Sequence, residues 1–251
     1  MEREITSLQH PLVKHLVRLR QNRDYREERQ SVFIEGGKLI GEVCSHKPAK
    51  VIIAYDSTYI PPGVMADEII MVSEAVMHKI SGLQTPEGVA AEAAIPQQAS
   101  LEGLRWILVC DGVSDPGNLG TLLRSGLALG WEGAFILNDS CDPYNDKAVR
   151  AAKGATFRLP IAMGTWSELQ RIIALNKLQP LAADIKGTSI NDIQIDGGAL
   201  LVLSNEAHGL SDEAQRLCQK VRIPMPGDME SLNVAVAGGI LMHMLKQKGS
   251  P

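Results

Sequence analysis

Three loops in the second half of the chain combine residue types that can bind a small polar ligand. They lie within 111–130, 201–211 and 223–245, and each contains or follows an apolar run typical of a strand. Proline, glycine and asparagine are concentrated there, with a few charged side chains among them. Ligands of open α/β sheets collect at the carboxyl ends of strands, so we expect the three loops to meet at one site.

The first loop places Pro116 and Asn118 before a helix whose second turn carries Arg124. Small residues let the backbone approach a ligand closely, and the start of a helix favours an anion. A tight strand-to-helix turn with an ordinary surface arginine would have the same pattern. The loop lacks the GxGxxG spacing, which argues against a nucleotide-dependent dehydrogenase.

The second and third loops add acceptors and a rigid backbone. Glu206 and Gly209 let the second loop present one carboxylate beside backbone donors. His208 invites a catalytic interpretation, but a lone loop histidine more often has no catalytic role. The third loop contains prolines and leads through Ser231 and Asn233 into VAVAGGILM, which by itself is typical of a close-packed core or interface helix.

The elements that would position these loops alternate between apolar strands and helices. The second part opens with the strand RWILVCDGV, and further strands are predicted at 133–138, 181–184 and 198–204. Helices are predicted at 118–130, 147–153, 167–175, 211–219 and 232–248. Near-continuous apolar strands between helices indicate a parallel sheet that is covered on both faces.

The first part of the chain has the pattern of a small α/β domain. A helix is predicted from about 11 to 28, and strands at 32–35, 51–55, 68–72 and 88–96. The polar segment PQQASLEG then marks a change in composition that is typical of a linker. We therefore expect a domain at 1–97, a linker at 98–104 and a second domain at 105–251.

Composition narrows the class of protein. The chain has 251 residues, 45% of them hydrophobic, which is enough for a sizeable core. The four cysteines lack CxxC or CxxH spacing, so neither a zinc site nor a disulfide framework is expected, and no metal is implied. No apolar run is long enough for a bilayer, and the first residues lack a signal-peptide core, so we expect a cytoplasmic protein without a membrane partner.

Charge is distributed unevenly along the chain. Residues 1–50 contain 10 Lys or Arg and 7 Asp or Glu, a net of +3, whereas 51–251 contain 15 and 22, a net of −7. Six bases lie within 14–29: Lys14, Arg18, Arg20, Arg23, Arg26 and Arg29. A helix would gather several of them on a face able to neutralise phosphates. A solvated helix with internal Arg–Glu pairs explains the same pattern equally well.

The three loops resemble, in order, the signature motifs of the SpoU (TrmH-like) family of RNA ribose 2′-O-methyltransferases, in the SPOUT superfamily. The residues that carry the resemblance are Asn118, Gly120 and Arg124; Asn205, Glu206 and Gly209; and Ile223, Pro224, Met225, Ser231, Leu232 and Asn233. The segment CDPYNDKAVRAAKGATFRLP (141–160) is similar as well. FIEGGKLIGE (33–42) and TPEGVAA (85–91) resemble a ribosomal-protein-like RNA-binding domain, so the likeness covers nearly the whole chain.

The resemblance implies an α/β fold with two domains. The C-terminal SPOUT domain is expected to be a parallel sheet with a deep trefoil knot, an exception to the general absence of knots. The chain after about Gly198 would thread through an earlier loop. The family forms homodimers through the knotted domain, and the segment 232–245 suits such an interface.

The resemblance also implies S-adenosyl-L-methionine as the cofactor, bound in a bent conformation. The residues expected to bind it are Ala183, Asp184, Gly187, Ser204, Asn205, Glu206, Gly209, Ile223, Met225, Ser231 and Leu232. Arg124 is the leading catalytic residue by similarity, oriented by Asn118 and Glu206, while Ser231 and Asn233 position substrate or cofactor. A guanidinium is a poor base, so charge stabilisation by Arg124 is favoured over proton abstraction.

The N-terminal domain is expected to bind the RNA. Candidate phosphate contacts are Arg18, Arg20, Arg23 and Arg26, and Glu35 to Lys38 mark a further binding face. A separate N-terminal domain favours rRNA over tRNA, because minimal tRNA methylases of the family often lack one. A tRNA methylase and a non-catalytic RNA-binding relative are the alternatives, although the latter would lose residues such as Asn118, Arg124, Glu206 or Asn233.

Two positions depart from the family pattern. Ala152 stands where many relatives have serine, and Ala235 stands where the third motif often has a second serine. Neither position carries the main catalytic role, so the departures concern details of ligand contact rather than the reaction.

Overall fold

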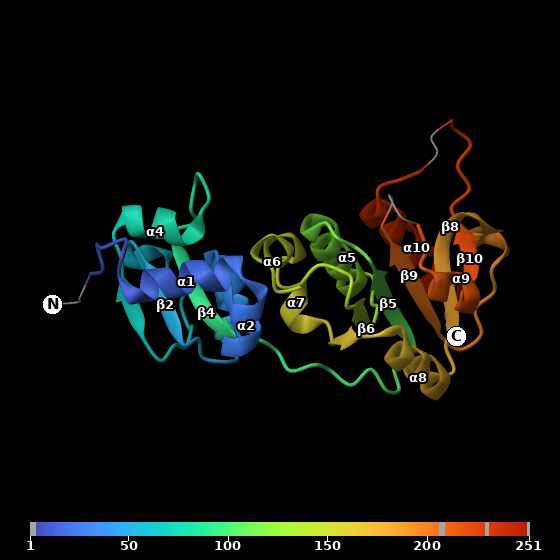
Figure 1. Ribbon diagram of the computed structural model, residues 1–251, viewed down its shortest axis with the longest axis horizontal. Helices are drawn as coiled ribbons and strands as arrows, with labels where there is room; N and C mark the ends of the chain where they lie inside the picture. Colours follow the sequence, from blue (N-terminus) through green and yellow to red (C-terminus); the bar gives the residue numbers. More distant parts are fainter. Residues whose placement is uncertain (1–3, 206–208, 229–230, 250–251) are drawn as a thin grey trace. The chain divides into compact units, whose positions relative to one another are not determined.

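The computed structural model describes residues 4–205, 209–228 and 231–249. The chain forms two compact units (Figure 1). The first contains Met1–Pro96 together with Tyr144–Gly154, and the second contains Gln97–Pro143 and Ala155–Pro251. A segment from the middle of the chain therefore groups with the N-terminal residues, which the sequence pattern did not indicate.

The first unit is built on a four-stranded mixed sheet. Its strands, in spatial order, are β1 (Ser31–Glu35), β4 (Val89–Ala94), β2 (Val51–Ala54) and β3 (Ile69–Met71). β4 pairs antiparallel with both β1 and β2, whereas β2 and β3 are parallel. This arrangement brings all four strands predicted for the N-terminal part into one sheet.

The helix predicted from 11 to 28 is two helices. α1 (Pro11–Gln21) ends at Asn22, which has extended backbone angles, and α2 (Arg23–Arg29) begins directly after it. The Asn22 side chain accepts a hydrogen bond from the Tyr25 N–H at 2.7 Å, so it caps the second helix. The prediction was wrong here because asparagine stabilises a helix start better than a helix interior.

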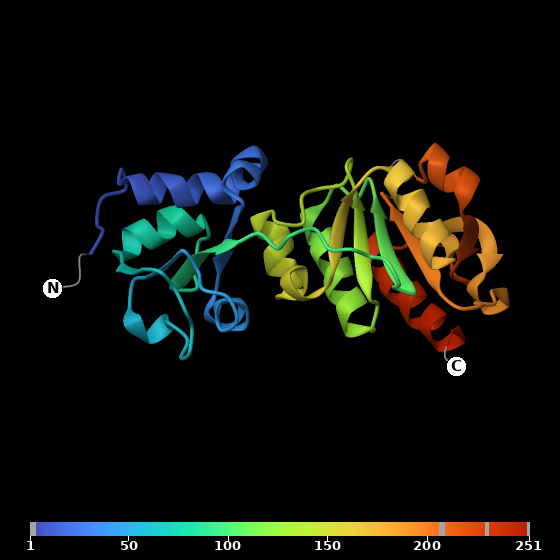
Figure 2. The same ribbon diagram turned by 90° about the horizontal axis from the view of Figure 1, so that it is seen from below.

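The other helices of the first unit are α3 (Gly37–Cys44), α4 (Glu74–Ser81), α6 (Asp146–Ala152) and the short 3₁₀ helix η1 (Ser57–Tyr59). Figure 2 shows α1 and α4 side by side on one face of the sheet. Leu16 and Leu19 of α1 pack there with Met77 and Ile80 of α4, and all four side chains are buried. The core of this unit is therefore aliphatic, as its low aromatic content requires.

The second unit contains a six-stranded sheet in which every adjacent pair is parallel. Its order is β10 (Gln219–Arg222), β8 (Gln179–Ser189), β9 (Ala199–Ser204), β5 (Trp106–Asp111), β6 (Gly133–Leu137) and β7 (Ile161–Gly164). Parallel pairing places the carboxyl ends of all six strands at one edge. Asp111 and Ser204 are register partners at the ends of β5 and β9.

Helices cover both faces of this sheet (Figure 2), as the apolar strand pattern predicted. The helices are α5 (Pro116–Ala128), α7 (Ala155–Arg158), α8 (Trp166–Asn176), α9 (Asp212–Leu217), α10 (Val234–Lys248) and the 3₁₀ helix η2 (Ile190–Asp192). Ile107 and Val109 pack toward Leu169 of α8 and Ala214 of α9. Gly238 of α10 lies against Leu122 and Leu203, so α5 and α10 cover the other face.

The predicted α/β class and the parallel sheet are confirmed. The trefoil knot concerns the threading of the chain rather than the pairing of strands, and it stays a prediction. None of the described helices is long and apolar enough to cross a membrane.

Candidate cofactor and catalytic site

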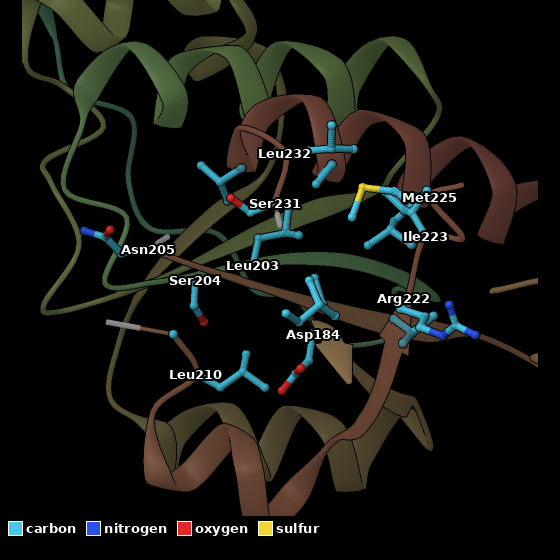
Figure 3. A pocket seen from close by; sticks show the side chains of 17 residues that line it. Asp184, Leu203, Ser204, Asn205, Leu210, Arg222, Ile223, Met225, Ser231 and Leu232 are labelled. Carbon is cyan, nitrogen blue, oxygen red and sulfur yellow. The ribbon is translucent and has the colours of Figure 1, made fainter. Parts of the chain in front are cut away.

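A cavity of about 300 Å³ opens at the carboxyl edge of the second sheet. The middle of β8 and the loops after β9 and β10 line it, and the first turns of α10 close one side. Figure 3 shows Asn205 at one end of this cavity, with Ile223, Met225 and Arg222 at the other. The volume lies in the range that small-molecule ligands occupy in proteins.

Nine of the eleven residues predicted to bind the cofactor line this cavity: Ala183, Asp184, Ser204, Asn205, Gly209, Ile223, Met225, Ser231 and Leu232. Gly187 does not line the cavity. If it had a side chain, the β-carbon would lie 2.5 Å from the backbone nitrogen of Val221 in β10. It therefore permits the close approach of β8 and β10. Glu206, with His208, lies outside the described residues.

The rest of the lining is mostly apolar. Leu203, Leu210, Val221, Val234, Ala237 and Leu241 complete the wall, together with Ile185 and Arg222. Sequence reasoning missed these residues because buried aliphatic side chains look like ordinary core. A flat apolar ring would fit between such walls, whereas the serine, asparagine and aspartate side chains supply polar groups at the margins.

Asp184 is the carboxylate among the described residues of the cavity wall. Lys220 lies 3.1 Å from Asp184 Oδ2, and the Lys186 N–H donates to Oδ1 at 2.8 Å. Burial by itself would raise the pKa of Asp184, but the hydrogen bonds and the two lysine charges outweigh it and lower the pKa overall. The wall therefore carries a stable negative charge at neutral pH.

The starts of α5 and α10 are joined beside this cavity. Asp115 caps α5, accepting from the Asn118 N–H at 2.7 Å, and Asn233 caps α10, accepting from the Ala235 N–H at 3.0 Å. The Asn233 side-chain amide also donates to Asn118 Oδ1 at 3.0 Å. This bond connects residues that are 115 positions apart, so the first and third motifs meet as predicted.

A smaller hollow of about 70 Å³ adjoins the junction and shares Asn205 and Val234 with the larger cavity. The Asn205 side-chain amide donates to Ser114 Oγ at 2.9 Å. The second motif is thereby joined to the loop before α5. Ser114 was not singled out in the sequence, because a lone serine in a turn carries no distinct signal.

Arg124 follows this junction along α5. It is exposed on α5 and lines neither hollow. Six residues along a helix correspond to faces about 120° apart, so Asn118 and Arg124 point in different directions. Within the described part of the chain, Asn118 bonds to Asn233, and the expectation that Asn118 orients Arg124 stays a prediction.

The comparisons with known proteins agree with this geometry. Residues 105–243, more than half of the chain, match the model of the SpoU rRNA methylase family. The chain belongs to this family. Within the described residues of this SpoU methylase, no cluster of three His, Cys, Asp or Glu side chains is suited to hold a metal ion.

Relatives of this SpoU methylase match both units. It is 28% identical to the Bacillus subtilis 23S rRNA (guanosine(2553)-2′-O)-methyltransferase RlmP, covering 97% of this chain and 99% of that one. It is 34% identical to the 23S rRNA (guanosine-2′-O-)-methyltransferase RlmB of Xanthomonas campestris, over 72% of this chain and 78% of that protein. The crystal structure of an AdoMet-bound rRNA methyltransferase from Sinorhizobium meliloti superposes with a TM-score of 0.84 at 28% identity, covering 98% and 97% of the two chains.

Residues 10–91 of the SpoU methylase match an MRM3-like substrate binding domain. The arginines predicted to contact RNA in this region differ in their surroundings. Arg26 is 2% exposed and donates to the Leu19 and Arg20 carbonyls at 2.8 and 3.1 Å. The prediction for Arg26 is therefore corrected, because its guanidinium holds α1 and α2 together and is withdrawn from the surface.

Two further arginines are also engaged. The Arg20 guanidinium lies over Gly82 at the end of α4, and its Nε is buried. Arg23 pairs with Glu27 at 2.8 Å, the internal Arg–Glu pairing that the charge pattern left open. Both contacts restrain side chains that were expected to be free for phosphates.

Arg18 differs from these arginines. It is exposed, and its guanidinium carbon lies 4.1 Å from the centre of the Tyr25 ring. It lines a surface groove of about 450 Å³ between α1 and α4, together with Lys14 and Lys79. The described residues that line this groove include three cations and no carboxylate. Lys38, the remaining predicted contact, lines a separate hollow with Glu35 and Glu42.

Proposed function

We propose that this SpoU methylase transfers a methyl group from S-adenosyl-L-methionine to a ribose 2′-hydroxyl of ribosomal RNA. The single observation that supports it most is the cavity formed by the middle of β8 and the loops after β9 and β10 in a member of this family. Two relatives that span most of the chain are named as 23S rRNA 2′-O-methyltransferases.

The residues of the cavity fit the cofactor. The apolar walls suit an adenine ring, and backbone groups of the three segments suit its edge and the ribose hydroxyls. Asp184 carries a negative charge in the cavity wall, which would suit a cationic sulfonium ligand. When bound, the cofactor supplies an electrophilic methyl group.

The side chains around the junction of α5 and α10 would position the reacting hydroxyl. A 2′-hydroxyl is a weak nucleophile, so the site must favour the developing alkoxide. Arg124 supplies a permanent positive charge for this purpose and for an adjacent phosphate, because a guanidinium keeps its proton. The Asn118–Asn233 pair and Ser231 would help to position the hydroxyl beside the methyl donor.

The first unit would bind the RNA through the groove between α1 and α4. Arg18, Lys14 and Lys79 supply charge for phosphates, and Gln9, Gln21 and Asn22 supply amides for 2′-hydroxyls. The match of residues 10–91 to a substrate-binding domain supports this assignment. The unit also favours rRNA over tRNA as the substrate.

Two architectural features belong to the same proposal. The C-terminal unit would contain a trefoil knot, and the chain would dimerise through it. The apolar side chain of Val236 is 52% exposed in the first turn of α10, which supports an intermolecular contact there.

Labelled S-adenosyl-L-methionine and total RNA test the reaction, with the wild type beside Arg124→Ala. We expect ribose methylation of one ribosomal RNA, reduced roughly 10²–10³-fold by Arg124→Ala with unchanged cofactor affinity. Arg171→Ala, a similarly exposed arginine of α8, is the matched control. Cofactor binding without labelling of any RNA, including ribosomal assembly intermediates, would instead favour a non-catalytic RNA-binding relative, and labelling of tRNA would correct the substrate.

A further inference from the structure

A carboxylate is buried at the end of the central strand β5. Asp111 is 3% exposed and follows five buried apolar residues of this strand. Burying an ionised carboxylate without a cation is costly, so such groups are retained where they have a specific task. Burial raises the pKa of Asp111, an effect opposed by bonds from Ser211 and Ser204 and reinforced by the nearby Asp139.

The hydrogen bonds of Asp111 converge on one oxygen atom. The Ser211 hydroxyl donates to Asp111 Oδ2 at 2.7 Å, and the Ser211 backbone N–H donates to it at 3.4 Å. The Ser204 hydroxyl, across the β5–β9 pair, donates to the same oxygen at 3.3 Å. Asp111 thus joins β5 to the end of β9 and to the start of α9.

The two serines flank the loop that supplies one wall of the cofactor cavity. Ser204 and its neighbour Asn205 line the cavity at the start of the loop, and Gly209 and Leu210 line it at the end, directly before Ser211. The Gly209 N–H also donates to the Asn205 carbonyl at 3.0 Å, which draws the two ends together. Both anchors of the loop therefore depend on the same buried carboxylate.

We infer that Asp111 is a positioning residue that fixes Ser204 and Ser211, at the two described ends of the loop after β9, so that their neighbours are placed to bind the cofactor. This inference rests on the proposed function of the cavity. Asp111 does not line the cavity, so it acts through Ser204 and Ser211. The alternative is a purely structural role, in which Asp111 supports the cap of α9.

The test compares Asp111→Asn with Asp139→Asn by calorimetric titration of S-adenosyl-L-methionine. Asparagine keeps the shape of the side chain but offers a neutral, weaker acceptor, so we expect the dissociation constant to rise roughly tenfold, about 1.4 kcal/mol. Asp139 lies at the end of the neighbouring strand and bonds to the Gly112 N–H, so its variant should stay within about twofold of the wild type. The KM for the cofactor should rise in the same proportion, with the KM for RNA unchanged.

A double-mutant cycle separates positioning from a structural role. Ser211→Ala removes the shortest bond to Asp111, so the affinity of the double variant should match that of the weaker single variant. A structural role would lower the melting temperature of cofactor-free protein and leave the affinity of the folded fraction unchanged. If Asp111→Asn does not fold, Ser211→Ala alone should still weaken cofactor binding.

Three outcomes would overturn the inference: wild-type affinity in Asp111→Asn, an equal loss in Asp139→Asn, or fold-changes that multiply in the double variant. Failure of the wild type to bind the cofactor would sink the proposed function itself, and this inference with it.

Discussion

The cavity of the second unit takes most of its polar side chains from β8 and from the loops after β9 and β10, whereas the groove of the first unit takes its side chains mainly from two helix faces. The parallel sheet brings the middle of β8 and the loops after β9 and β10 together whatever their distance in sequence. A helix distributes neighbouring residues around its axis, so adjacent arginines face different surroundings. Residues in strand-end loops can thus be assigned to a shared site from sequence order, but residues of a basic helix cannot.

Substitution of the buried Arg26 tests this difference with the larger expected effect on stability. Arg26→Met removes charged hydrogen bonds to two carbonyls and leaves them buried, so the first unit should lose about 2–3 kcal/mol of unfolding free energy. All three tryptophans, Trp106, Trp131 and Trp166, lie in the second unit, so their fluorescence reports that unit alone. In urea, the circular dichroism transition should therefore shift while the tryptophan transition stays in place.

Arg23→Met is the control for Arg26→Met. Its partner is the exposed Glu27, and exposed ion pairs contribute at most about 1 kcal/mol. A shift in Arg23→Met as large as that in Arg26→Met would refute the distinction between a buried anchor and a surface pair.

Substitution of the cations in the groove between α1 and α4 should have a smaller effect, and it should act on RNA binding. Removing both lysines in Lys14→Ala/Lys79→Ala should weaken binding of the RNA substrate. The slope of log affinity against log salt should fall by about two, because each lysine that neutralises a phosphate adds about one to it. Lys47→Ala, at an exposed lysine of the same unit outside the groove, should leave the slope unchanged. An unaltered slope in the double variant would place the RNA elsewhere.

Sequence reasoning located the elements that periodicity determines. The apolar strands of the second sheet and the three loops that follow them were recognisable, because a parallel sheet needs buried strands and flanking turns. The break at Asn22 and the return of α6 to the first unit depend on side-chain caps and tertiary contacts that have no period. Gly187 was assigned to the ligand from the resemblance, and its close approach to β10 is visible only in the fold.

Asp111 was recognisable in principle. A charged residue that ends a continuous apolar strand has to be either solvated or held by hydrogen bonds, and RWILVCDGV contains this pattern. Its partners, Ser204 and Ser211, are 93 and 100 residues away, so only the fold reveals which alternative applies.

The central claim is that the cavity at the carboxyl edge of the second sheet binds S-adenosyl-L-methionine. Calorimetric titration of the wild type, Ala183→Phe and Ala174→Phe tests it most directly, because Ala183 lines the cavity and Ala174 is exposed on α8. We predict one cofactor site per chain in the wild type and in Ala174→Phe. In folded Ala183→Phe the phenyl ring should fill the cavity and lower the affinity at least roughly 100-fold. Unchanged affinity in Ala183→Phe would contradict the account and place the cofactor elsewhere.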